Sequence, residues 1–177
     1  MTCVCLYRPA DGAWPAIERS WTFSDPVRRP EAHAAEMLKA RDEIQPLLAD
    51  APFLYAFNGA EFDLPILGRW LSHSVGPWMA KLVDPLYAAR WLMGTGACIK
   101  LDVWLTRNGM ETKSASGLEA VRMAAEERFQ DLADYCMRDT RLTHLMINAA
   151  RAGPVPWNDR YAYHPFDANV LFTHVAH

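Results

Sequence analysis

The most informative segment of the chain is FLYAFNGAEFDLP, residues 53–65. It opens with five apolar residues that end at an Asn58-Gly59 pair, and a short apolar run of this kind is typical of a strand buried on both faces. Pro65 suits the first turn of a helix, so an amphipathic helix is expected to follow. The segment predicts a strand, a tight turn and a helix, with Asp63 near the carboxyl edge of a sheet, where functional sites collect in α/β proteins.

The rest of the chain predicts further strands and helices around this segment. Residues 2–7 and 19–24 alternate like the two arms of a β-hairpin with a long loop, and residues 81–83 suit a brief strand. Apolar residues recur at helical spacing over the ranges 31–48 (with Pro46 expected to kink or end the helix), 101–108, 116–125 and 127–150. Asp84-Pro85 reads as a helix cap followed by proline at the first helical position. We therefore expect one layered α/β domain over residues 1–150, with residues 151–177 as a tail that packs on it and includes a strand at 170–175.

Composition and charge restrict the function classes. The chain has 177 residues and a net charge of −3, which argues against a high-affinity duplex binder but not against an enzyme that touches a strand end. No apolar run approaches the roughly 20 residues of a bilayer span, and no signal peptide is visible, so we expect an intracellular protein without a membrane partner. The cysteines, Cys3, Cys5, Cys98 and Cys136, lack the paired spacing of a zinc site and read as reduced, packed thiols.

The last predicted helix carries a carboxylate on its apolar stripe. Asp139 lies seven residues from both Leu132 and Met146, near the middle of that stripe. A buried, ionised carboxylate is costly without a partner, so an arginine, a helix N-terminus or a divalent metal ion is expected beside it. Tyr135 precedes Asp139 by one turn, and both side chains therefore point the same way.

These two motifs, in this order, resemble those of the DEDDy group of RNase H-like 3′–5′ exonucleases, which includes the proofreading domains of DNA polymerases. The second motif of that family is Asn-Gly-x-x-Phe-Asp, matched by residues 58–63, and the third is Tyr-x-x-x-Asp, matched by Tyr135 and Asp139. Residues 84–86 and 100–102 resemble the family's entries to the two intervening helices. The similarity covers roughly residues 2–148.

The resemblance implies a mixed β-sheet flanked by helices and a two-metal mechanism. Asp63 and Asp139 would be ligands of Mg²⁺ or Mn²⁺, and Tyr135 would align the attacking water. The substrate would be the 3′ end of single-stranded DNA or RNA.

Three further residues are candidates for substrate binding. Asn58 would position a nucleotide, although the simpler explanation, which we favour, is that it forms the turn. Phe62 would stack on a base, although an aromatic residue is more often part of the core. Lys113 would contact phosphate, although a solvated surface charge is the default.

The chain departs from the family at the first motif, since no Asp-x-Glu occurs near the N-terminus. In the family that motif lies on a central strand. Three arrangements would account for it: the chain is shortened, another chain or a second copy lends a strand, or the tail fills the slot with Phe-Asp-Ala-Asn at residues 166–169. The leading hypothesis is a metal-dependent 3′–5′ exonuclease. The alternatives are a catalytically incomplete RNase H-like domain that binds nucleic acid or a protein partner, and an unrelated α/β protein with chance motifs.

Overall fold

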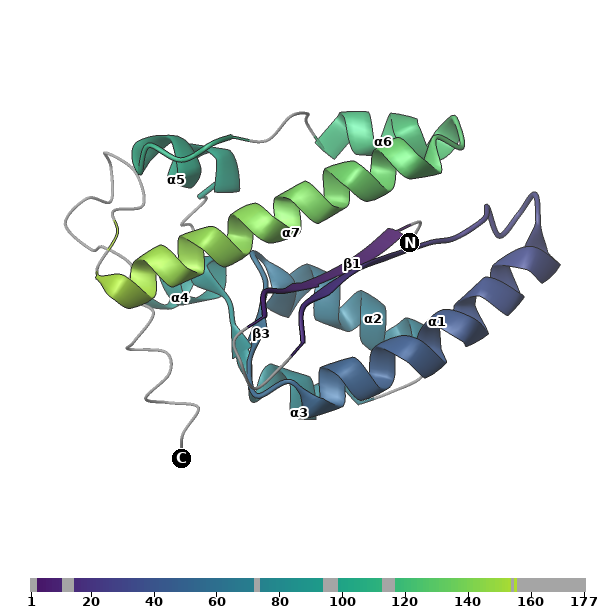
Figure 1. Ribbon diagram of the computed structural model, residues 1–177, viewed down its shortest axis with the longest axis horizontal. Helices are drawn as coiled ribbons and strands as arrows, with labels where there is room; N and C mark the ends of the chain where they lie inside the picture. Colours follow the sequence, from purple (N-terminus) through teal and green to yellow (C-terminus); the bar gives the residue numbers. More distant parts are fainter. Residues whose placement is uncertain are drawn as a thin grey trace. The chain divides into compact units, whose positions relative to one another are not determined.

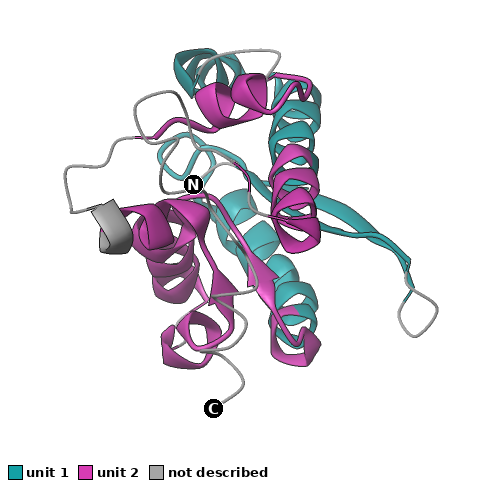
Figure 2. Ribbon diagram, turned by 90° about the vertical axis from the view of Figure 1, so that its left-hand side faces the viewer, with its two compact units in different colours: residues 1–47, 113–141 teal, residues 48–112, 142–177 magenta. Residues whose placement is uncertain are grey.

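The computed structural model describes residues 3–10, 15–71, 74–93, 99–112, 117–153 and 155 (Figure 1). The chain divides into two compact units, coloured separately in Figure 2. Unit 1 comprises Met1–Leu47 and Lys113–Arg141, and unit 2 comprises Leu48–Thr112 and Leu142–His177. The expected boundary between a domain at 1–150 and a tail at 151–177 stays a prediction, because residues 156–177 lie outside the described part.

Unit 1 begins with a β-hairpin, as the sequence predicts. Strand β1, Cys3–Arg8, pairs antiparallel with β2, Ile17–Thr22, in a register that sets Cys3 opposite Thr22 and Arg8 opposite Ile17. Helix α1, Pro30–Asp50, follows. Its Glu36 carboxylate accepts hydrogen bonds from the backbone N–H and the hydroxyl of Ser24, at 2.7 and 2.9 Å. These bonds attach the end of the hairpin to the helix.

Helix α1 buries the apolar face predicted from the sequence, and it continues past Pro46. Ala40, Ile44 and Leu48 are almost fully buried, as expected from their spacing of three to four residues. Pro46 is exposed and does not end the helix, which continues to Asp50. Trp21 of β2 donates its indole N–H to Glu43 of this helix at 2.9 Å, which is a second link between α1 and the hairpin.

The remainder of unit 1 is helical. Helix α6 spans Gly117–Ala125, and α7 spans Phe129–Ala152, with its residues up to Arg141 in unit 1. Between them Arg128 forms ion pairs with Glu119, Glu126 and Asp131. The predicted helices at 116–125 and 127–150 are thus confirmed to within two residues at each end.

Unit 2 contains a second, parallel pair of strands. Strand β3, Leu54–Tyr55, pairs with β4, Leu82–Val83. Between them lie a π-helical turn η1, Gly59–Asp63, and helices α2, Leu64–Trp70, and α3, Gly76–Met79. Helices α4, Pro85–Met93, and α5, Leu101–Arg107, follow β4. The strand, turn and helix expected from residues 53–65 are therefore present, although the strand is shorter than its apolar run.

The core of unit 2 is built from β4, α4, α5 and the second half of α7. Trp104 and Leu105 of α5 are completely buried, as are Met146 and Ile147 of α7. Phe57 packs on the Trp104 ring, with ring centroids 6.1 Å apart. Since a fully buried side chain of this kind contributes roughly 1.5–3 kcal/mol, this cluster is the principal source of stability in unit 2.

Lys81 links two distant parts of unit 2. Its ammonium group donates to the carbonyl oxygens of Leu48, Ala49 and Ala51, at 2.6, 2.9 and 2.9 Å. The last turn of α1 contains no basic residue, so this lysine supplies the positive charge that a helix C-terminus favours.

The predicted RNase H-like fold is wrong. The strands of the described residues form two separate two-stranded sheets, β1–β2 and β3–β4, rather than one central mixed sheet. The physical reason is that a connecting strand is missing from the described residues. In the resembled family the strand with Asp-x-Glu is central, whereas here no described strand pairs with both the hairpin and β3. The chain is a mostly helical α/β protein. The predicted tail strand at 170–175, and the Phe-Asp-Ala-Asn segment at 166–169, lie outside the described residues.

The helices are those of a protein with amphipathic surfaces. The two longest, α1 and α7, both contain charged residues, although α7 has none between Arg141 and Arg151. Among the described residues, no helix has both the length and the apolar character that crossing a bilayer would require.

Candidate functional site

The turn that presents Asp63 has a backbone that only a few residue types adopt. Asn58 has φ 67° and ψ 23°, the left-handed region that asparagine tolerates better than most residues. Gly59 follows, and a Cβ added there would lie 2.4 Å from the Cβ of Ala56. The Asn-Gly pair is therefore required by the turn itself. This accounts for Asn58 without a ligand, and its role in substrate binding stays a prediction.

A buried carboxylate that the sequence analysis treated only as a helix cap holds this turn in place. Asp84 is 4% exposed. Its Oδ1 accepts from the backbone N–H groups of Leu86 and Tyr87, at 3.0 and 3.3 Å, which confirms the predicted cap of α4. The same Oδ1 accepts from the N–H of Asn58 at 3.0 Å, and Oδ2 accepts from that of Ala60 at 2.9 Å.

The second role of Asp84 has an electrostatic consequence. Burial raises the pKa of the Asp84 carboxyl above its ordinary value, and the four N–H donors oppose that rise. The sequence indicates only that Asp84 directly follows a strand; its position beside the turn depends on the parallel pairing of β3 and β4, which brings their carboxyl ends to one edge.

Asp63 lies at the end of this turn, on the surface. It is the last residue of η1, and its side chain is exposed. Phe62 is 59% exposed, so it is a surface aromatic rather than a core residue. Glu61 forms an ion pair with Arg90 of α4. The turn thus presents a carboxylate and an aromatic ring to solvent beside an ion pair.

Tyr135 and Asp139 lie one turn apart on α7, as predicted, and both are half-buried. Leu132, Leu142 and Met146 of the same stripe are buried. Both residues belong to unit 1, whereas Asp63 belongs to unit 2, so the metal site that would include Asp63 and Asp139 stays a prediction.

Basic residues of this part of the chain include Lys113, the candidate for phosphate binding, and Arg141 of α7. Lys113 lies outside the described residues. Arg141 forms an ion pair with Glu18 of β2, and its guanidinium carbon lies 5.8 Å from the centroid of the Tyr7 ring. Arg141 is thus engaged within unit 1.

A polar group on the second half of α7 was missed from the sequence. His144, Asn148 and Arg151 recur at four- and three-residue spacing on one face. The His144 ring stacks on Tyr55 with centroids 6.1 Å apart, and Asn148 Nδ2 donates to His144 Nε2 at 2.7 Å. Arg151 donates to the Tyr55 hydroxyl at 3.2 Å. Burial, with a smaller contribution from Arg151, lowers the pKa of His144, so the imidazole is held neutral.

The described residues bring together one set of three side chains able to hold a metal ion, and it is not acidic. Cys3, Cys5 and Cys136 are free thiols, all half-buried, whose Sγ atoms lie within 4.8 Å of one another. A hydrogen bond with Cys136 is the main cause that raises the pKa of Cys3 to about 12, and the same thiol raises the pKa of Cys5. The expectation of packed, reduced thiols agrees with these three free, half-buried cysteines, whereas Cys98 lies outside the described residues. The convergence of the three sulfur atoms was not predicted.

The chain was compared with known proteins in three ways. No protein-family model matches it, and no match was found among curated proteins or among solved structures. The functional interpretation therefore depends on the residues themselves.

Proposed function

We propose that this protein takes part in metal-dependent hydrolysis of phosphodiester bonds at the 3′ end of a single-stranded nucleic acid. The observation that carries the proposal is the turn at residues 58–63. It presents the exposed Asp63 carboxylate at the carboxyl end of a parallel strand, in a conformation that Gly59 permits and Asp84 holds. A rigid carboxylate at such an edge is the kind of ligand that a catalytic Mg²⁺ or Mn²⁺ requires.

Each sequence motif has a role in this proposal. Asp63 and Asp139 provide carboxylate oxygens to the metal ions, and Tyr135 orients the attacking water. Phe62, already exposed beside Asp63, offers a face on which the terminal base stacks. Metal ions held by these carboxylates would supply stabilisation of the charge on the leaving 3′ oxygen. We include an intracellular location in the proposal, because Cys3, Cys5 and Cys136 are free and reducing compartments disfavour disulfides.

A second candidate is favoured by a specific observation. Among the described residues, no cluster of three or more ligating groups is acidic, whereas two divalent cations need several carboxylates to offset their charge. The alternative function is therefore binding of a nucleic-acid end or of a protein partner without hydrolysis. A partner chain, or a second copy, that contributes the missing carboxylates would restore activity.

A nuclease assay distinguishes the two functions. Purified protein is incubated with Mn²⁺ and single-stranded DNA or RNA labelled at the 5′ or the 3′ end. The proposal expects stepwise shortening from the 3′ end that EDTA abolishes and that falls by roughly 100-fold or more in Asp63→Asn and Asp139→Asn, since ligands of catalytic metals are lost. Asp134→Asn is the matched control, because Asp134 is an exposed residue of the same helix.

Two outcomes count against hydrolysis. One is the absence of metal-dependent shortening while the labelled strand is still retained in a filter-binding assay, which supports the binding function. The other is shortening that persists unchanged in both variants, which indicates a contaminating nuclease. The chain carries a net charge of −3. An unrelated acidic protein of similar charge therefore serves as the control for non-specific retention of the strand at moderate salt.

A further inference from the structure

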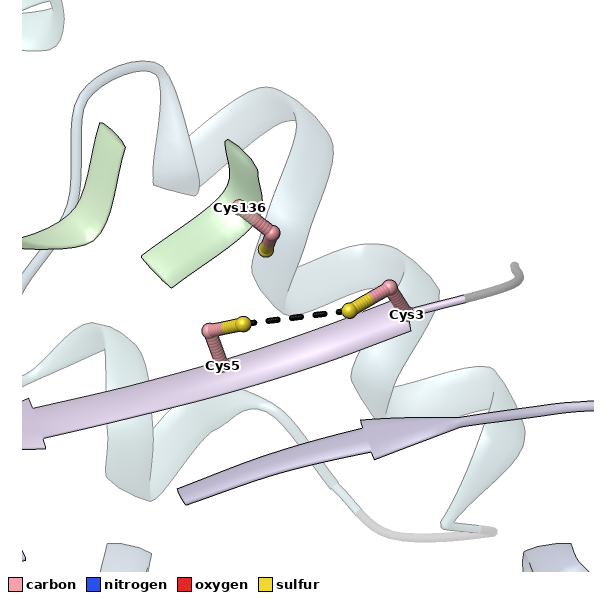
Figure 3. A group of neighbouring side chains, drawn as sticks. All are labelled: Cys3, Cys5 and Cys136. Carbon is pink, nitrogen blue, oxygen red and sulfur yellow. Dashed lines mark hydrogen bonds between the residues drawn. The ribbon is translucent and has the colours of Figure 1, made fainter. Parts of the chain in front are cut away.

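Three cysteines from the two ends of unit 1 converge on one point. Cys3 and Cys5 are two residues apart on β1, so their side chains project from the same face of the strand. Cys136 comes from α7, and Figure 3 shows its side chain directed toward the two on the strand. Cys5 Sγ also lies 3.7 Å from the carbonyl oxygen of Ala133, one turn before Cys136. The hairpin and helix α7 are therefore in contact through the side chains of these cysteines.

The spacing of the sulfur atoms suits a thiolate metal site. Cys3 Sγ and Cys5 Sγ are 3.7 Å apart, and all three sulfurs lie within 4.8 Å of one another. In a tetrahedral zinc site with Zn–S bonds of about 2.3 Å, two sulfurs are separated by about 3.8 Å. One edge of the tetrahedron already has this length. The other two sulfur–sulfur distances need to shorten by at most about 1 Å to match it.

We propose that Cys3, Cys5 and Cys136 form a binding site for a single Zn²⁺ ion, with a fourth position left for an exchangeable ligand such as water. Thiolate ligands select zinc over the hard cations Mg²⁺ and Mn²⁺, so this site is chemically separate from the proposed nuclease metals. The three thiols are half-buried rather than sealed, which leaves a route for the ion.

The site would act as a clamp within unit 1. It joins β1, at the start of the chain, to α7, and the ligand spacing of two residues on a strand followed by a distant third explains why no zinc motif is visible in the sequence. Because a metal that binds only the folded arrangement adds its binding free energy to folding, Zn²⁺ is expected to raise the melting temperature of the full chain.

Cobalt is the spectroscopic probe. The reduced full-length protein is titrated with Co²⁺ and absorbance is recorded in the ultraviolet and visible ranges. The proposal expects thiolate-to-cobalt charge-transfer bands that saturate at one ion per chain and disappear when Zn²⁺ is added. Cys136→Ser should weaken binding by more than the roughly 10- to 100-fold that loss of an outer hydrogen-bond partner causes. Asp134→Asn, which alters an exposed residue of the same helix as Cys136, is the matched control and should leave the bands unchanged.

A second measurement needs no variant. The protein is alkylated with iodoacetamide with and without Zn²⁺, and each cysteine is quantified by peptide mass spectrometry. Protection of Cys3, Cys5 and Cys136 together supports the site. Absence of cobalt bands in the parent protein, an unchanged cobalt affinity in Cys136→Ser, or equal alkylation with and without Zn²⁺ would each show that the three thiols are only packed together.

Discussion

Replacement of Asp84 tests whether one carboxylate organises the edge of the β3–β4 sheet. In Asp84→Ala, four backbone N–H groups lose their acceptor: those of Leu86 and Tyr87 at the start of α4, and those of Asn58 and Ala60 in the turn. Loss of a helix cap costs about 1 kcal/mol, and each unsatisfied N–H of the turn costs about 1–3 kcal/mol.

The net loss is smaller than these costs taken together, because the parent protein also spends free energy to bury the carboxylate, as the raised pKa of Asp84 indicates. We expect Asp84→Ala to lower the free energy of unfolding by about 3 kcal/mol, which corresponds to a melting temperature lower by roughly 6–12 °C for a chain of this size. Urea unfolding followed by circular dichroism measures the free energy.

The asparagine variant separates the two oxygens of Asp84. Oδ1 accepts three of the four bonds, and an amide oxygen can replace it. Oδ2 accepts the fourth, from Ala60, and an amide NH₂ there would face another donor. Asp84→Asn should therefore cost only about 1–2 kcal/mol. Asp42→Ala, which removes an exposed carboxylate of α1, should stay within about 0.5 kcal/mol of the parent. If Asp84→Ala matches Asp42→Ala, or Asp84→Asn is as unstable as Asp84→Ala, the bond assignment is refuted.

Three other predictions follow from single residues. Gly59→Ala places a Cβ 2.4 Å from that of Ala56 and should cost about 1–3 kcal/mol in urea unfolding, whereas Gly117→Ala, where nothing lies within 4 Å, should not destabilise. Trp104→Ala removes a completely buried ring and should cost about 3–5 kcal/mol in the same assay. His144 has a pKa lowered by burial, so the parent should lose stability as the pH falls below 6.5 toward the folded-state pKa, and His144→Gln should lack that loss.

The sign of the His144 effect follows from proton binding. Below pH 6.5 the unfolded chain takes up a proton on this ring more readily than the folded chain, so acidification favours unfolding, while above it both states are neutral and the contribution is complete. Thermal melts at several pH values, compared between parent and variant, isolate this residue. Parallel pH profiles of the two proteins would contradict the assignment to His144. The separate prediction for Trp104 would be contradicted by a Trp104→Ala variant no less stable than one altered at the exposed Val103.

Local features of the fold were predictable from the sequence because they depend on nearby residues. The hairpin, the long helix α7, the turn at Asn58-Gly59 and the cap at Asp84 each follow from spacing or turn chemistry within a few residues. Pro46 was an exception: sequence rules expected a kink or a stop there, and α1 continues past it to Asp50.

Pairing between distant segments was not predictable in the same way. The resemblance implied a central sheet, but strand pairing depends on partners far along the chain, and among the described strands β1–β2 and β3–β4 pair separately. For the candidate site, Asp63 follows a strand and a turn, and Tyr135 and Asp139 share one helix, as expected, but the exposure of Asp63 was not predicted. The bond from Asp84 to Ala60 and the convergence of Cys136 on the hairpin depend on tertiary structure that no local pattern contains.

Two of the three bonds from Lys81 go to carbonyl groups at the end of α1, and they bear on the order in which the chain folds. The carbonyl groups of Leu48 and Ala49 accept from Lys81, which lies more than thirty residues later in the sequence. These bonds can form only after that later segment has packed against the helix end. A peptide containing α1 alone should therefore fray at its final turn, and hydrogen exchange there should slow only when the β4 segment docks. The stability of the last turn of α1 therefore depends on a residue outside the helix. Acetylation of the Lys81 amine would destabilise that turn without changing any residue of α1.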